Sequence, residues 1–293
     1  MPQPYPFDET IAYLDEIDQW LRGCGLKAHD RIRKYRKNIK EMIEFQGWDE
    51  NLETLQNITE GRRREIFWSY VEVDEFVRAV RPLRAALGDE LPAVPIRRAL
   101  NGPADLSLET QRSSQGRQGR NFMFELVMGG RLAKGGFVPA FDQGPDIQFN
   151  YPSLRVAMQC KRPFSMDGME ETIGKAISQL KNDRADLNII AVSVSRLWNL
   201  GDPDEIPIVR DPAMAQAYLD GRGRRIADET QRFWKEKLER AGIVFYGYAP
   251  VSWQMENGRF GHATLRAETM CPVMADDMQT KVLLASYANE LGA

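Results

Sequence analysis

The sequence predicts an α/β protein in which a mixed β-sheet is flanked by helices and preceded by an all-α segment. Apolar residues recur at helical spacing through roughly the first hundred residues. Short apolar runs that fit buried strands follow only after that segment, and they alternate with further helices. We therefore expect a helical N-terminal domain over residues 1–105 and an α/β domain over residues 106–293, with the boundary in the proline-containing segment 88–103.

The overall composition excludes several classes of protein. The chain has 293 residues, of which 43% are hydrophobic, so it can form one large or two ordinary folded domains. Its net charge of −3 gives no general attraction to polyanions, so contacts to nucleic acid have to come from local basic patches. Three dispersed cysteines and two histidines fit neither a disulfide framework nor a zinc site. The N-terminal segment is acidic and no apolar run is long enough to span a bilayer, so we expect a soluble, cytoplasmic protein without a membrane partner.

Three helices are predicted in the N-terminal part. The first starts at Asp8 as its N-cap and stops at Gly23, the second covers residues 31–43, and the third covers residues 62–87, where Pro82 should kink or break it. The second helix carries a basic stripe, consisting of Arg31, Arg33, Lys34, Arg36, Lys37 and Lys40. With the arginines at 62–64, this basic stripe either follows a nucleic-acid backbone or is simply a solvated helix face.

A further helix is predicted from Gly119 to Lys134, with Glu125 among apolar neighbours and Gly135-Gly136 as its stop. The polar segment 113–120 before it is either a loop that contacts phosphates or a linker. Three short strands follow, over residues 137–141, 145–149 and 154–161, with a bend at Gln143-Gly144 and a turn at residues 151–153.

The third of these strands predicts a polar site. Alternation places Val156, Met158 and Cys160 on an apolar face, and Arg155, Ala157, Gln159 and Lys161 on the other. Asp146 opens the preceding strand, so the hairpin brings its carboxylate beside Gln159. Oxygen donors from Asp146, Gln159 and, as a third, Glu125 suit Mg²⁺ or Mn²⁺ rather than zinc. Lys161 places an ammonium against a phosphate or an attacking water.

Phosphodiester hydrolysis requires such a set of groups, because a hard cation and a fixed lysine stabilise the charge that develops on the phosphate. A helix Glu, then Pro145-Asp146, then a hairpin and Gln159-x-Lys161-Arg162 resembles the PD-(D/E)XK nuclease superfamily, and its Mrr-type restriction endonucleases in particular. The resemblance runs from Gly116 to about Leu180. It implies a restriction-endonuclease-like core with Glu125, Asp146, Gln159 and Lys161 as catalytic residues. The implied metal ligands are Asp146, Gln159, Glu125 and the backbone carbonyl of Cys160.

The resemblance implies a Mg²⁺- or Mn²⁺-dependent endonuclease that cuts DNA, with RNA as the alternative substrate, in restriction or anti-phage defence. We expect it to act as a homodimer or within a larger defence complex. The candidate contacts to nucleic acid are Arg120, Arg162, Lys175 and Gln179. Lys175 and Gln179 lie one turn apart on a helix and either face the site or are surface polar residues.

Residue 159 departs from the acidic form of the motif. A neutral amide gives the site one negative charge fewer than a Glu would, so metal affinity should be weaker. The alternative from another class is therefore a catalytically inactive nuclease fold that binds nucleic acid or acts as a scaffold.

The rest of the chain predicts alternating helices and strands. We expect a helix over residues 169–181, a buried strand over 187–194, a helix over 213–241 that breaks at 221–225, a strand over 242–252 and a closing helix over 278–291.

Overall fold

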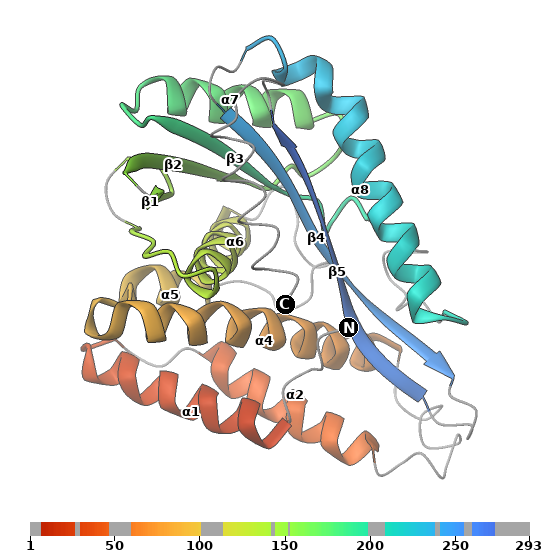
Figure 1. Cartoon of the computed structure of the whole chain (residues 1–293). Helices are drawn as coiled ribbons and strands as arrows, with labels where there is room; N and C mark the ends of the chain where they lie inside the picture. The colour runs from red at the N-terminus through yellow and green to blue at the C-terminus, as the bar shows by residue number, and fades with distance from the viewer. Residues whose placement is uncertain are drawn as a thin grey trace.

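The computed structural model describes residues 7–26, 30–46, 60–100, 114–141, 144–151, 153–198, 209–237, 241–254 and 260–272. These residues form a mixed α/β fold (Figure 1). The helices are α1 (Phe7–Gly23), α2 (Asp30–Gln46), α4 (Glu60–Leu87), the 3-10 turn η2 (Gly88–Glu90), α5 (Ala93–Ala99), α6 (Ser114–Lys134), α7 (Met169–Lys181) and α8 (Pro212–Trp234). The strands are β1 (Ile147–Tyr151), β2 (Leu154–Lys161), β3 (Leu187–Ser193), β4 (Ala241–Gln254) and β5 (Phe260–Pro272).

The five strands form one sheet in the order β1-β2-β3-β4-β5. The three central strands are parallel to one another, and an antiparallel hairpin lies at each edge. Helices α7 and α8 connect the parallel strands, and both lie on the same side of the sheet in Figure 1. Both connections run in the same direction along the sheet, from β2 to β3 and from β3 to β4. Two right-handed crossovers in the same direction place both helices on the same face.

Both faces of the sheet are covered. Val156 and Met158 of β2 face a core that includes α4 and α6, whereas Ala157 faces a second core with α7 and α8. Residues 156–160 are therefore all buried, and Gln159 is only 2% exposed. Alternation predicted that only the apolar face of this strand is buried, but Ala157 and Gln159 of the polar face are buried as well, because a helix covers each side.

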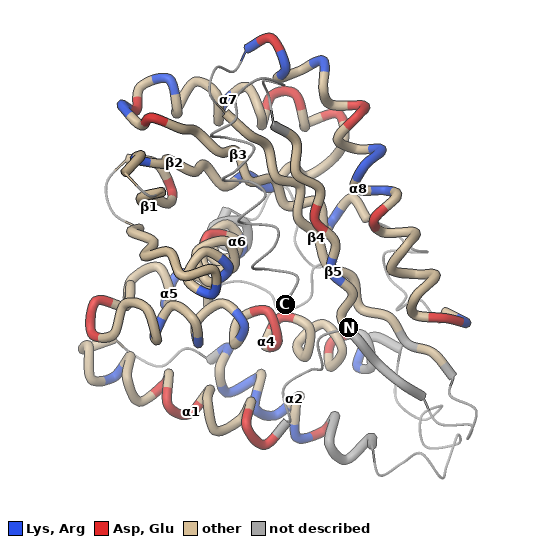
Figure 2. Tube along the Cα trace, in the orientation of Figure 1, with Lys and Arg blue, Asp and Glu red and all other residues tan. Residues whose placement is uncertain are grey.

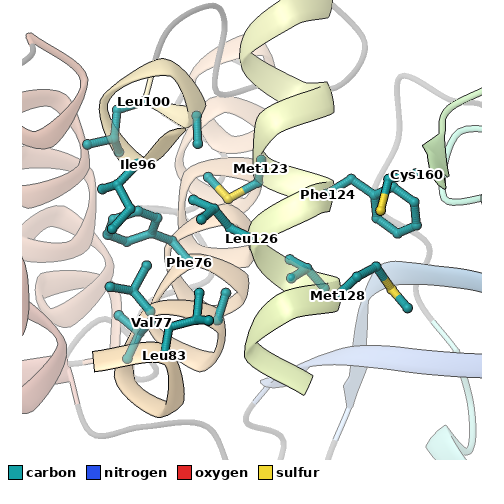
Figure 3. Packing of buried hydrophobic residues seen from close by; sticks show 14 of the residues in the cluster. Phe76, Val77, Leu83, Ile96, Leu100, Met123, Phe124, Leu126, Met128 and Cys160 are labelled. Carbon is teal, nitrogen blue, oxygen red and sulfur yellow. The ribbon is translucent and has the colours of Figure 1, made fainter. Parts of the chain in front are cut away.

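The N-terminal helices share a core with the later part of the chain. One cluster of buried apolar residues includes members of α1, α2, α4, α5 and α6 and of the first four strands. Figure 3 shows Met123 and Leu126 of α6 pointing toward Phe76 of α4 and Ile96 of α5. The proposed boundary between residues 105 and 106 lies outside the described residues and remains a prediction.

Helices α4 and α6 cross in direct backbone contact at Gly130. A Cβ atom added there would lie 2.4 Å from the backbone oxygen of Ala79, closer than any side chain tolerates. A glycine normally weakens the middle of a helix, so the close crossing explains its presence.

The end of α6 confirms the predicted stop and explains a missing strand. Gly136 has a φ of 79°, and the N–H of Phe137 donates to the carbonyl of Leu132 at 3.0 Å, as in a Schellman cap. The predicted strand over 137–141 is reduced to a single bridge between Ala140 and Gln148. Because the cap already uses the N–H of Phe137, that end of the segment cannot join the sheet.

Other predicted elements differ at their ends or continuity. Helix α1 begins at Phe7, so Asp8 lies in its first turn, and α6 begins at Ser114, so most of segment 113–120 is helix instead of loop or linker. Helix α4 continues through Pro82 to Leu87, so the proline does not break it. The prediction for α7 is confirmed at both ends.

The predicted break in α8 is wrong. The helix continues through residues 221–225 because Gly223 packs tightly, and an added Cβ would lie 2.7 Å from Oγ1 of Thr269. Strand β5 was not predicted, although residues 262–268 alternate polar and apolar side chains as a strand with one buried face does. Gln143 and the predicted helix over 278–291 lie outside the described residues. In the part of the chain that the structure describes, no helix is long and apolar enough to cross a membrane.

The middle of α4 carries three buried carboxylates, visible as a red stretch in Figure 2. The first, Glu72, is fully buried and forms ion pairs with Arg31 of α2 and, at 2.8 Å, with Arg120 of α6. Tyr35 of α2 also donates a hydrogen bond to Glu72. This one carboxylate therefore links three helices.

The other two carboxylates join α4 to the sheet. Glu75 accepts a hydrogen bond from the hydroxyl of Tyr246 in β4 at 2.6 Å and pairs with Arg266 in β5. Asp74 pairs with Arg266 as well, and with Arg78 at 3.0 Å. Through these contacts α4 stays attached to the β4–β5 hairpin.

The basic stripe of α2 is largely neutralised within the protein. Arg36 pairs with Asp15 and Asp18 of α1, and Lys34 pairs with Glu65 of α4. Arg31 is 5% exposed. For Arg31 both predicted interpretations, a contact to a nucleic-acid backbone and a solvated face, are wrong, because its charge is required inside the core.

Replacing Glu72 with glutamine should lower the free energy of unfolding by about 3 kcal/mol, because the substitution leaves two buried guanidinium groups without a counter-charge. Urea denaturation followed by circular dichroism measures this change. The matched control is Glu16→Gln, which removes an exposed pair with Arg84 and should cost less than about 1 kcal/mol. Equal effects of the two substitutions would contradict a structural role for Glu72.

Candidate functional site

The β1–β2 hairpin positions the first two residues of the motif. Pairing of the two strands begins at Ile147 opposite Met158, so β1 offers no backbone partner to Cys160. Asp146, directly before β1, fills this place: its Oδ2 accepts a hydrogen bond from the N–H of Cys160 at 2.7 Å. The carboxylate is thereby held at the open end of the hairpin.

The carbonyl of Cys160 points to the same side as its N–H. A residue in a hydrogen-bonded antiparallel pair exchanges both bonds with one partner, so the two groups share a direction. The N–H points toward Asp146, and the carbonyl oxygen therefore also lies on the Asp146 side of β2. The backbone thus supplies a further oxygen to this place.

Lys161 joins the two side-chain oxygens of the motif. Its Nζ donates to Oε1 of Gln159 at 2.7 Å and lies 3.4 Å from Oδ2 of Asp146. Gln159 is buried, whereas Lys161 and Asp146 are 18% and 24% exposed. The predicted proximity of these three residues is confirmed, and the cluster is accessible from one side.

Glu125 of α6 lies next to this cluster. Burial raises the pKa of Glu125 from 4.5 to about 8, and the negative charge of Asp146 adds to the rise, while the positive charges of Lys161 and Arg98 oppose it. Among the described residues, no group donates a hydrogen bond to the Glu125 carboxylate. It is thus a poorly solvated acid beside Asp146.

The thiol of Cys160 is not a reactive group. Burial raises its pKa well above the ordinary value, and the charges of Asp146 and Glu125 raise it further. The side chain packs in the core near Phe124, as Figure 3 shows. Only the backbone of Cys160 belongs to the site.

The donor atoms of this cluster are all oxygens. They comprise two carboxylates, one amide and one backbone carbonyl, a set that suits a hard cation such as Mg²⁺ and lacks the thiolate and imidazole ligands that zinc prefers. No group of three or more His, Cys, Asp and Glu side chains within the described residues is placed to hold a metal. A cation here would therefore depend on Gln159 and on the backbone of Cys160 as well as on the carboxylates.

A surface groove extends from Lys161 along α7. The α7 residues that line it are Glu171, Thr172, Gly174, Lys175, Ser178 and Gln179. Lys175 and Gln179 therefore lie on the same groove as Lys161, although Lys175 also pairs with Glu171 on its own helix. Lys175 and Gln179 are thus surface polar residues that line the groove, and their contact with nucleic acid stays a prediction.

The other two predicted contacts to nucleic acid, Arg120 and Arg162, are not among the residues that line this groove. Arg120 is 2% exposed and paired with Glu72, so its assignment to a nucleic-acid surface is not supported, because the core requires its charge. Arg162 is half-buried, and its charge acts on Tyr248 of β4. Burial raises the pKa of Tyr248 to about 12, and the charges of Arg120 and Arg162 oppose that rise.

Arg98 of α5 is a residue near the site that the sequence did not indicate. It is exposed, it stacks over the ring of Phe122, and its charge reaches Glu125. It belongs to the segment predicted as a separate helical domain, and no local pattern connects it with α6. Only the packing of α5 on α6 reveals the relation.

Comparison of the chain with protein-family models, with curated proteins and with solved structures gave no match.

The raised pKa of Glu125 predicts a pH dependence of stability. Between about pH 4.5 and pH 8 the folded state keeps this proton while the unfolded state releases it, so the free energy of unfolding should fall as the pH rises through this window. Glu125→Gln cannot ionise. From pH 4.5 to pH 8 the free energy of unfolding of this variant should therefore fall less than that of the wild type. The difference between the two decreases should be on the order of a few kcal/mol.

Urea denaturation at a series of pH values measures the difference. Glu171→Gln is the control, since Glu171 is an exposed carboxylate of α7, and this variant should follow the wild type. Identical pH profiles for Glu125→Gln and the wild type would mean that the Glu125 carboxyl is well solvated.

Proposed function

We propose that this protein is a metal-dependent endonuclease that hydrolyses phosphodiester bonds of DNA. The observation that carries the proposal is the position of the Lys161 ammonium between Oε1 of Gln159 and Oδ2 of Asp146, with the Glu125 carboxylate alongside. A buried acid, a second acid, an oxygen donor and a lysine at one strand end are the groups that this reaction requires.

Each residue has a defined part in this proposal. Asp146, Gln159, Glu125 and the carbonyl of Cys160 would hold Mg²⁺ or Mn²⁺, which would withdraw charge from the phosphate during hydrolysis. Lys161 presents a positive charge to the scissile phosphate. The α7 groove with Lys175 and Gln179 would receive the DNA backbone.

The fold supports this proposal through the order of its elements. Helix α6, the β1–β2 hairpin, α7 and the parallel strand β3 follow one another as the resemblance to PD-(D/E)XK nucleases implies. The Ala140 bridge stands where the first strand of a three-strand meander is expected. We propose on this basis a restriction-endonuclease-like core.

The neutral amide of Gln159 favours a second candidate, a nuclease fold that binds nucleic acid without cutting it. Two carboxylates hold a cation less strongly than three, so a glutamine in place of an acidic residue affects cleavage more than it affects nucleic-acid binding. We further propose a role in restriction or anti-phage defence, as a homodimer or in a larger complex in the cytoplasm, with RNA as the alternative substrate. These proposals rest on the resemblance.

Cleavage of plasmid and linear DNA with Mg²⁺ or Mn²⁺ tests the catalytic proposal. Asp146→Asn and Lys161→Met should each reduce the rate by at least about 100-fold, because each removes a charge at the scissile phosphate or its cation. Asparagine keeps an oxygen for the N–H of Cys160, so the hairpin end should remain intact. The control Lys181→Met changes an exposed lysine of α7 and should leave the rate unchanged. Wild-type rates in either site variant would show that the reaction occurs elsewhere.

Calorimetric titration with Mn²⁺ should separate the same two variants by the sign of their effect. Asp146→Asn should weaken binding about tenfold or more, since it removes a negatively charged ligand. Lys161→Met should tighten binding by about tenfold, because the ammonium no longer competes for the oxygens of Gln159 and Asp146. Weaker Mn²⁺ binding by Lys161→Met would contradict a competition between the Lys161 ammonium and the metal ion for these oxygens. Cation binding without cleavage by the wild type would favour the inactive fold.

A further inference from the structure

Helix α5 presents two arginines to solvent at the side of α6. Its residues Ile96 and Ala99 are buried, and Figure 3 shows Ile96 directed into the packing with α4 and α6. The opposite face consequently exposes Arg97 and Arg98. The burial of the apolar face fixes the direction of both arginines.

Arg98 contacts α6. Its guanidinium lies 5.1 Å from the ring centroid of Phe122, which precedes Glu125 by one helical turn on the same side of α6. Glu125 is the acidic residue of this helix. An aromatic contact, and no ion pair, thus holds Arg98 on the side of α6 that carries Glu125.

The charge of Arg98 is available to a ligand. No carboxylate among the described residues lies within ion-pair distance of its guanidinium, in contrast to Arg31, Arg120 and Arg266, which are all paired with acids. Stacking on an aromatic ring restrains the guanidinium while leaving its N–H groups free to donate. A planar guanidinium of this kind matches the oxygens of a phosphate.

We propose that Arg98 is a phosphate-binding residue that holds a backbone phosphate of duplex DNA next to the scissile one. The inference rests on the proposed function and extends it to a residue of the N-terminal helices. Helices α5 and α6 lie on one face of the sheet and α7 on the other, so Arg98 and Lys175 belong to the layers on opposite faces of the sheet that carries Lys161. The N-terminal helices thereby contribute directly to binding the substrate.

Binding of the full-length protein to a fluorescently labelled DNA duplex, without divalent cations and over a range of salt concentrations, tests the proposal. Arg98→Gln keeps an aliphatic stem over Phe122 but loses the charge. Its dissociation constant should rise about five- to tenfold, and the slope of log affinity against log salt should fall by about one. Arg98→Lys should keep the slope of the wild type, because the charge remains, while binding more weakly.

Arg97→Gln is the matched control, since Arg97 is the exposed neighbour on the same helix and should leave both quantities unchanged. Circular dichroism checks that each variant is folded. If Arg98→Gln is unfolded while Arg98→Lys folds and binds DNA normally, Arg98 has a structural role and the proposal is overturned. If the wild type binds DNA and Arg98→Gln behaves like Arg97→Gln, the role of Arg98 is refuted while the proposed function stands. If the wild type neither binds nor cuts DNA, both are refuted.

Discussion

The fold depends on placing three carboxylates of α4 in the interior, where each has cationic or hydroxyl partners. Glu72 joins α2 and α6, and Glu75 and Asp74 join the β4–β5 hairpin. Buried charges are costly without partners, so these contacts specify how the helical layer sits on the sheet. Helix α6 is further confined by the backbone contact at Gly130. The position of Glu125 on α6 is therefore a consequence of the core, not of the site.

The candidate site balances charge closely. Burial and the neighbouring Asp146 already raise the pKa of Glu125 to about 8, so a third carboxylate at position 159 would add repulsion in a poorly solvated place. Gln159 supplies an oxygen without that charge, and Lys161 offsets what remains. The Lys161 ammonium and a divalent cation would bind the same oxygens of Gln159 and Asp146, so the affinity for the cation should depend on the charge of Lys161.

The sequence by itself determined the elements whose signal is local. Helix α7 and the core of β2 and β3 follow from apolar periodicity within a single segment, and the stop of α6 follows from Gly135-Gly136. The order and spacing of Asp146, Gln159 and Lys161 also predicted their proximity, because a tight hairpin brings them together with little help from the rest of the chain.

Only the tertiary structure decided the features that depend on partners far apart in the sequence. The burial of Arg120 reflects a carboxylate on α4, and the unbroken course of α8 reflects the packing of Gly223 against β5. Both faces of β2 are buried because helices from different segments cover them. Arg98 approaches Glu125 through the contact of α5 with α6. Local periodicity carries no information on such long-range burial and charge pairing, because their energies arise only when distant segments meet.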